Sequence, residues 1–261
     1  MTPRNRPEHL ESLDRGLRVL ELFGHDGVHD FTMTEVAERL DITRASALRL
    51  LATLEALGYI HGDGRSYRLG VRILSLGYAY LSSLGFGTVA RPELEALMRD
   101  TGETCSIGLL DGPDVVYIVR VEVHRIVRMD LGAGSRLPAY ISSMGRLLLG
   151  ALPDKELDAY LRALEPKAVA RRTITDKRIL RRRIIETREP GWCYINGEVE
   201  DRVAGLSVPL KNETGATVAA LNLTLMHETY SIRDIRGVLL PKLFAAAKLI
   251  EALIGKGLPV R

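Results

Sequence analysis

The sequence lacks the features by which several classes of protein are recognised. Its 261 residues include two cysteines, Cys105 and Cys193, which are too few for a disulfide framework or for a zinc site made of cysteines alone. The longest apolar stretch, residues 238–254, is interrupted by charged side chains, and the N-terminal segment MTPRNRPEHLESLDRG contains no apolar run. We therefore expect no membrane-spanning segment and no secretory signal, and we expect a cytoplasmic protein.

Signatures of enzymes are missing as well. The chain contains no G-x-S-x-G elbow, no Walker-type glycine loop and no H-E-x-x-H helix motif. Its six histidines are scattered along the chain and belong to no recognised metal-binding motif. We therefore expect no catalytic residue, no bound metal and no cofactor, although an enzyme activity in one part of the chain stays open as an alternative.

The composition is that of a globular protein, with 46% hydrophobic and 26% charged residues in 28.9 kDa, a size that suits two compact domains. The net charge of +3 suggests nucleic acid, but residues 1–70 hold nine arginines against eleven acidic residues. Overall charge therefore decides nothing, and the local placement of arginines must carry any argument for DNA binding.

Residues 10–70 show the order of elements that is typical of a winged helix-turn-helix. Apolar residues in 10–23 recur at helical spacing, Thr34 is predicted to cap a short helix over 35–40, and Thr43 is predicted to start a longer helix that Gly58 ends. Residues 59–61 and 66–69 flank the glycine-rich segment 62–65, which predicts a hairpin. Two packed helices beside a surface hairpin are the alternative interpretation.

The polar face of the longer helix favours DNA binding. In a helix-turn-helix the N-terminal end of the second helix enters the major groove, where arginine reads guanine and short hydroxyls contact phosphates or bases. The candidate DNA-contacting residues at this end are Thr43, Arg44, Ala45, Ser46 and Arg49. Arg65 and Arg68 of the hairpin are candidates for phosphate or minor-groove contacts.

Residues 71–101 are predicted to form linker helices between two domains. The stretch 71–84 carries apolar residues on two helical stripes, and a second helix follows at about 89–100 after the break Gly85-Phe86-Gly87. The doubled stripe is predicted to make a dimer contact, which would match a palindromic operator in double-stranded DNA. Packing within one chain against the second domain stays open as the alternative.

Residues 102–261 have the pattern of an α+β domain on a mainly antiparallel sheet. Strands are predicted over 105–111, 114–122, 126–132, 192–196, 203–211 and 217–226. Helices are predicted over 142–152, 154–164, 176–188 and 231–254.

Four stretches resemble the IclR family of bacterial transcription regulators: LDRGLRVLELF, TEVAERLDITRASALRLLATLEALGYI, GSRLPAYISSMGRLLLGALP and GLSVPLKNETGATVAALNLT. The resemblance runs from Leu13 onward and implies a winged-helix DNA-binding domain, a linker helix and a GAF-like effector domain that binds a small organic acid, in homodimers or tetramers. Within the family, the sequence is most similar to the branch that governs aromatic-acid catabolism. The effectors of that branch include protocatechuate, 4-hydroxybenzoate and β-ketoadipate. Because members of that branch often activate transcription, RNA polymerase is a further candidate partner. A regulator of the same fold without a small-molecule effector is the alternative.

The resemblance also implies where an effector would bind. The candidate residues are Leu137, Pro138, Ser142, Ser143, Met144, Asn196, Val203, Gly205, Asn222 and Thr224. The residues themselves agree, because a serine that caps the helix after Pro138 would leave backbone N–H groups for a carboxylate, and Gly145 would let a ligand approach the backbone. Plain capping of that helix is the alternative role for the serines.

Two arginine-containing stretches have less certain roles. Relatives in this branch usually read E-G-L-R-S where this chain has DRVAG at 201–205, so Arg202 is either displaced into the site or a loop residue, and the loop is the better interpretation. The basic stretch 171–189 carries an ordinary apolar stripe, and we expect its charges to form a solvated helix face.

Overall fold

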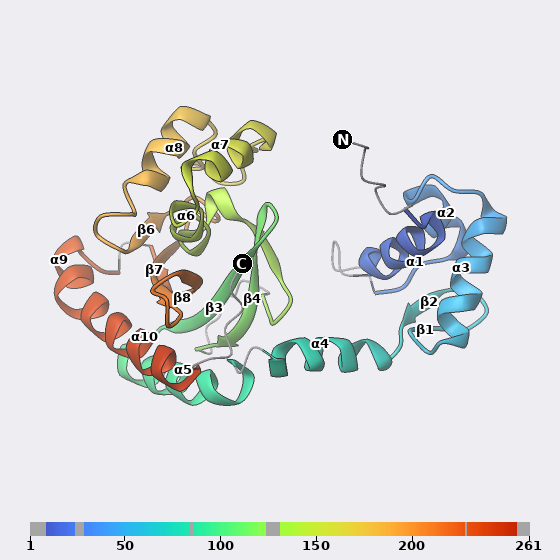
Figure 1. Ribbon diagram of the computed structural model, residues 1–261, viewed down its shortest axis with the longest axis horizontal. Helices are drawn as coiled ribbons and strands as arrows, with labels where there is room; N and C mark the ends of the chain where they lie inside the picture. The colour runs from blue at the N-terminus through green and yellow to red at the C-terminus, as the bar shows by residue number, and fades with distance from the viewer. Residues whose placement is uncertain (1–8, 24–28, 84–85, 124–130, 228, 255–261) are drawn as a thin grey trace, which may run out of the picture. The chain divides into compact units, whose positions relative to one another are not determined.

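A computed structural model describes residues 9–23, 29–83, 86–123, 131–227 and 229–254 of the chain. The chain divides into two compact units, Met1–Tyr80 and Leu81–Arg261 (Figure 1). None of the helices in the described residues has the length and apolar composition needed to cross a bilayer.

The first unit contains three packed helices and a two-stranded hairpin. They are α1 (Glu11–Leu22), α2 (Met33–Arg39), α3 (Arg44–Ala56), β1 (Ile60–Gly62) and β2 (Tyr67–Leu69), and α4 (Arg72–Ser83) follows. The core is built from one apolar side of each helix, with Val19, Val36 and Leu51 fully buried around Phe31. The helix-turn-helix and its hairpin are therefore as the sequence predicts.

The start of α2 differs from the expectation. Thr32 caps this helix and Thr34 lies inside it, because Thr32 and Glu35 form a capping box in which the Thr32 side chain accepts from the Glu35 backbone and the Glu35 side chain accepts from the Thr32 backbone. The turn to α3 passes through Asp41, which has a left-handed backbone with φ +52°.

The second unit is a six-stranded antiparallel sheet with helices on both faces, which confirms the predicted α+β domain on an antiparallel sheet but adds the covering of both faces, which was not predicted. Its strand order is β5-β4-β3-β8-β7-β6. The strands are β3 (Thr104–Asp111), β4 (Asp114–Val121), β5 (Arg136–Pro138), β6 (Cys193–Asn196), β7 (Val203–Lys211) and β8 (Thr217–Met226). Each neighbouring pair is antiparallel.

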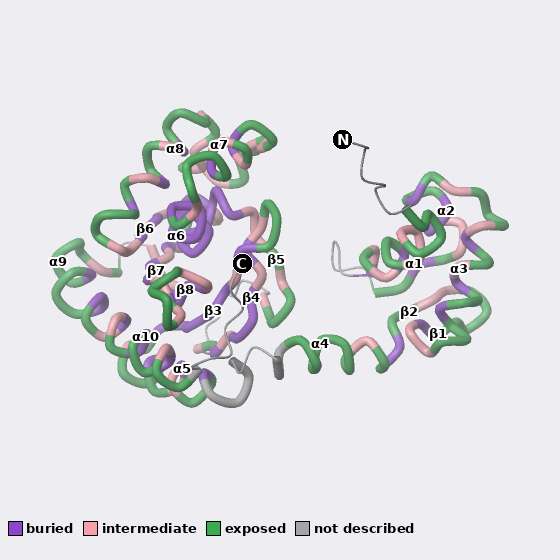
Figure 2. The backbone as a smooth tube through the Cα atoms, viewed as in Figure 1, coloured by how far each residue is buried: buried purple, intermediate pink, exposed green. Residues whose placement is uncertain are grey.

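Two groups of helices cover the two faces of this sheet (Figure 1). One face carries α5 (Phe86–Thr101), α9 (Ile232–Asp234) and α10 (Leu240–Ile254), and the other carries α6 (Ser143–Gly150), α7 (Asp154–Ala163) and α8 (Lys177–Ile185). Purple segments in Figure 2 mark where the strands and α6 are buried between these layers. The α6 side of the sheet holds the candidate effector site.

Several elements differ from the expectation in detail. The helix predicted over 231–254 contains a π-helical segment at Ile235–Leu239, and the short edge strand β5 was not anticipated. The helix α5 begins at Phe86, so Phe86 and Gly87 lie inside a helix and not in the expected break. Most of the strand predicted over 126–132 lies outside the described residues.

Candidate functional site

The N-terminal end of α3, which the sequence predicts to contact DNA, begins with a local cap. The Thr43 hydroxyl oxygen accepts from the Ser46 backbone at 3.2 Å and contacts the Ser46 hydroxyl at 3.0 Å, which fixes the first turn. Ala47, Leu51 and Leu54 bury the opposite face of the helix. The predicted contact residues lie on the outer side, where Thr43, Arg44, Ala45 and Arg49 are exposed and Ser46 is half-buried.

The two hairpin arginines are also exposed. Asp63 holds the hairpin tip in shape. Its carboxylate accepts hydrogen bonds from the backbone N–H groups of Arg65 and Ser66, at 2.8 Å each. The bond from Ser66 has the largest effect, the bond from Arg65 the next, and both lower the pKa of Asp63 below its usual value. The turn therefore holds its shape independently of any ligand, with Arg65 and Arg68 directed outward.

The candidate effector cavity lies between the first turn of α6 and the sheet and has a volume of about 30 Å³. Eight of the ten predicted effector residues line it: Leu137, Ser142, Ser143, Met144, Val203, Gly205, Asn222 and Thr224. Four lining residues were not predicted: Tyr117, Ile195, Val199 and Ala204. Among the described residues that line the cavity, none carries a charge.

Asn196 and Pro138 are not part of this lining. Ile195 pairs with Gly205, and both line the cavity, so alternation along β6 turns Asn196 to the other side. There its Oδ1 contacts Nδ1 of His227. Side chains alternate between the two faces of a strand, and Ile195 pairs with Gly205 on the neighbouring strand. Starting from Gly205, this rule alone would have identified Ile195 as a cavity residue.

A buried polar cluster faces the otherwise apolar cavity. Ser143 and Ser207 share a hydroxyl contact of 2.8 Å, and the Asn222 amide donates to both hydroxyls at 3.1 Å. The Thr224 hydroxyl in turn donates to the Asn222 carbonyl oxygen at 3.1 Å. Because Ser143, Ser207 and Asn222 are buried, these bonds fix the positions of their side chains.

The two serines at the start of α6 have different roles. The Ser142 hydroxyl oxygen accepts from the Gly145 backbone at 2.8 Å and caps the helix, whereas Ser143 belongs to the polar cluster. A Cβ at Gly205 would lie 2.5 Å from the Ser143 Oγ, so glycine is required for this close approach. A Cβ at Gly145 would lie 2.1 Å from the Ala139 carbonyl oxygen. Gly145 therefore serves close packing against the backbone at Ala139, and the expectation that it admits a ligand was wrong.

Burial raises the pKa of the Tyr117 phenol to about 12. Tyr117 stands on β4 opposite Gly108, on the cavity side of the sheet. Its hydroxyl stays protonated at neutral pH and can donate a hydrogen bond.

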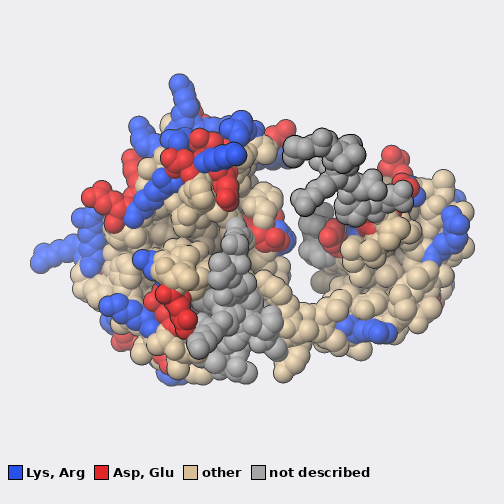
Figure 3. Space-filling view, in the orientation of Figure 1, with Lys and Arg blue, Asp and Glu red and all other residues tan. Residues whose placement is uncertain are grey.

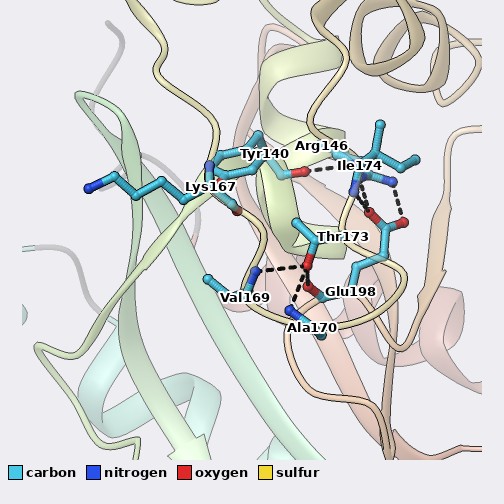
Figure 4. Close-up of polar contacts among 8 residues, drawn as sticks. All are labelled: Tyr140, Arg146, Lys167, Val169, Ala170, Thr173, Ile174 and Glu198. Atoms are coloured by element: carbon cyan, nitrogen blue, oxygen red, sulfur yellow. Dashed lines mark hydrogen bonds and ion pairs between the residues drawn. The ribbon is translucent and has the colours of Figure 1, made fainter.

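A buried ion pair joins two walls of the cavity (Figure 4). Arg146 follows Ser143 by one turn of α6, and its Nη1 donates to Glu198 Oε1 at 2.8 Å while Nη2 pairs with Oε2. Its Nε donates to the Tyr140 carbonyl at 2.8 Å. Glu198 stands beside Val199 of the opposite wall. The sequence does not reveal this pair, because the two residues are 52 positions apart and meet only in the folded chain.

The connection between α7 and α8 is fastened to the same place (Figure 4). The Thr173 hydroxyl donates to the Glu198 carbonyl at 2.7 Å and accepts from the Val169 and Ala170 backbone. The Tyr140 hydroxyl exchanges bonds of 2.8 Å with the backbone of Lys167. Residues 167–174 are thus bonded both to the segment before α6 and to the segment after β6.

The less certain arginines lie away from the cavity. Arg202 is exposed, and it is not among the residues that line the cavity. Blue and red side chains are interspersed over α7 and α8 in Figure 3, and ion pairs join Arg181 to Asp158 and Arg188 to Asp154. The basic stretch is therefore a mixed, solvated face. Within the described part of the chain, no group of three or more His, Cys, Asp and Glu side chains could hold a metal.

Each of the two units matches a known protein-family model. The model of the IclR helix-turn-helix domain matches residues 12–64, and the model of the bacterial transcriptional regulator IclR C-terminal domain matches residues 78–252. The chain belongs to the IclR family. It is therefore a transcriptional regulator with an N-terminal DNA-binding helix-turn-helix and a C-terminal effector-binding domain.

Individual relatives narrow the comparison. The Pca regulon regulatory protein of Pseudomonas putida is 37% identical over 251 residues, which cover 95% of this chain and 86% of that protein. The p-hydroxybenzoate hydroxylase transcriptional activator of Acinetobacter baylyi is 33% identical over 82% of this chain and 81% of its own. An IclR homologue from Microbacterium hydrocarbonoxydans, solved in complex with 4-hydroxybenzoate, is 25% identical with a TM-score of 0.82, covering 94% of this chain and 99% of that one.

Proposed function

We propose that this regulator controls genes of aromatic-acid catabolism in response to a small aromatic or keto acid bound in the cavity at the start of α6. The observation that carries the proposal is the hydrogen-bonded cluster of the buried Ser143 and Asn222 with the half-buried Thr224, in a cavity whose other walls are mostly apolar. Apolar walls with a few fixed polar groups are the usual form of a small-molecule site. The names of similar proteins, a p-hydroxybenzoate hydroxylase activator and a homologue solved with 4-hydroxybenzoate, support an aromatic acid as the class of compound.

The acid group is expected at the N-terminal end of α6. The first backbone N–H groups of a helix and the positive end of its dipole favour an anion, and Ser142 already serves as the cap. The ring or chain would then lie against Leu137, Met144 and Val203, and the polar cluster would meet a ring hydroxyl or a second oxygen.

Titration calorimetry with 4-hydroxybenzoate, protocatechuate and β-ketoadipate tests the site. Asn222→Ala should weaken binding of the preferred acid by about 1.5–3 kcal/mol if it bonds a charged oxygen, and by about 0.5–1.5 kcal/mol if it bonds a neutral one. Asn212→Ala in the distant β7–β8 turn is the matched control and should leave the affinity unchanged. If none of the acids binds, the chain is a regulator of this fold without such an effector.

On the DNA side, we propose that a dimer binds a palindromic operator through the outer face of α3. Arg44→Ala and Arg49→Ala should each cost about 1–3 kcal/mol of operator affinity if the arginine makes a base contact. Arg18→Ala on the exposed side of α1 is the control for simple loss of charge. Gel-shift titrations in which the double substitution changes nothing would refute this assignment.

Residues 71–101 are proposed to link the units and to carry the dimer contact. Val71, Leu74 and Tyr78 are 78%, 72% and 74% exposed on one chain, which is unusual for large apolar side chains on one helix. Light scattering after size exclusion should show a dimer or tetramer for the natural chain and a smaller species for Leu74→Glu. Contact with RNA polymerase, if the regulator activates, would be a separate surface.

A further inference from the structure

The segment that follows α3 and the segment that precedes α4 lie side by side at the base of the β1–β2 hairpin. The Gly70 backbone donates to the Tyr59 carbonyl at 2.8 Å, although the hairpin separates the two residues in sequence. A Cβ at Gly70 would lie 2.4 Å from the Gly58 carbonyl oxygen, so a larger residue would force the two backbones apart. This contact places the first turn of α4 against the C-terminal end of the DNA-reading helix.

Arg72 closes the same junction with its side chain. Its Nη1 donates to the carbonyl of Leu57, the C-cap residue of α3, at 2.7 Å. Its Cζ lies 5.2 Å from the centre of the Tyr59 ring. A guanidinium can do both at once because it is planar and has several fixed donors, and its charge suits the negative end of the α3 dipole.

Past its first turn, α4 is an exposed helix. Green covers most of α4 in Figure 2, and Leu74, Leu76 and Tyr78 are 72%, 56% and 74% exposed. The direction of α4 relative to α3 therefore depends strongly on the junction formed by Gly70 and Arg72.

We propose that Arg72 is a positioning residue that locks α3 to α4, so that any change in the direction of α4 turns the DNA-reading helix with it. The proposal deepens the function proposed above, because it rests on α4 carrying the dimer contact. In such a dimer, the junction sets the distance between the two DNA-reading helices, and hence which half-site spacing the protein accepts.

Distances between spin labels on the full chain test the lock without DNA. Labels at exposed Ala52 on α3 and exposed Ser75 on α4, in labelled chain diluted with unlabelled chain, report the angle between the two helices. The distance distribution should be narrow in the natural chain and broad in Arg72→Ala. It should also be broad in Arg72→Lys, which keeps the charge but loses the planar fork. Arg68→Ala in the same hairpin is the matched control and should stay narrow. An Arg72→Ala distribution as narrow as that of the natural chain would overturn the proposal.

Operators whose half-sites are moved apart by one or two base pairs test the consequence. The natural protein should lose about tenfold or more in affinity on the altered spacing, comparable to loss of a base contact. Arg72→Ala should bind all spacings about equally, with an unchanged melting temperature. If Arg72→Ala instead weakens all operators by the same factor and Arg72→Lys restores them, Arg72 is a phosphate contact and the lock is refuted. If the natural protein shows no spacing preference, the palindromic operator proposed above fails, while the spin-label result still decides the junction.

Discussion

Removing Glu198 should strongly destabilise the C-terminal unit. In Glu198→Ala the Arg146 guanidinium, 3% exposed, stays buried without its carboxylate partner. Breaking one side of a buried pair typically costs about 3–5 kcal/mol, because the remaining charge has lost its water and gained nothing in return. For a unit of this size, about 2–4 °C of melting temperature corresponds to 1 kcal/mol, so a fall of roughly 6–20 °C is expected.

Urea unfolding followed by tryptophan fluorescence measures this loss of stability in the C-terminal unit. The chain has one tryptophan, Trp192, which immediately precedes β6. The double variant Arg146→Met, Glu198→Leu removes both charges and should recover most of the lost stability. Arg181→Ala is the control, because its ion pair with Asp158 is 41% exposed on both sides and solvent screens it. The reasoning fails if Glu198→Ala unfolds at the same urea concentration as the natural chain, or if the double variant is no more stable than the single one.

Three further substitutions have directions that follow from the geometry. Met144→Ala should cost about 2–5 kcal/mol of stability but enlarge the cavity, so thermal shift should show a lower melting temperature and a larger rise with a ring-bearing acid. Asp41→Gly should stabilise the DNA-binding unit by up to about 1 kcal/mol in thermal unfolding followed by circular dichroism, since φ +52° suits glycine. Backbone N–H donation from Arg178 and Ile179 lowers the pKa of Asp176, so its stabilising effect is complete above its unfolded pKa of about 3.9 and is lost as the pH falls through the lower folded value. Asp176→Asn should therefore flatten the acid side of the stability curve, and parallel acid curves for both proteins would contradict this.

Elements with strong local signals could be predicted from the sequence. Thr43 ahead of a helical apolar stripe gave the cap and face of α3, and alternation placed Asn222 and Thr224 on one side of β8. The misassigned cap of α2 was also a local signal, since Thr32 and Glu35 stand at capping-box spacing.

What could not be predicted depends on contacts between distant parts of the chain. The edge strand β5 is three residues long and exists because it pairs with β4, which no periodicity within three residues can reveal. The pair of Arg146 and Glu198 likewise depends on α6 and the segment after β6 meeting in space. Asn196 was misplaced because a family pattern assigned it to the site, whereas the strand register turns Ile195 inward.

The size of the cavity determines how an effector must enter. A volume of about 30 Å³ holds about two water molecules, which is less than a six-membered ring with a carboxylate requires. The start of α6 is held by its cap, and the Arg146–Glu198 pair ties it to the segment that carries Val199. That segment is itself bonded to the α7–α8 connection, through Thr173 on the Glu198 carbonyl and through the Arg171 backbone on Asp201. If a ring-bearing acid binds in this cavity, we therefore expect residues 170–174 to move together with the segment that carries Val199.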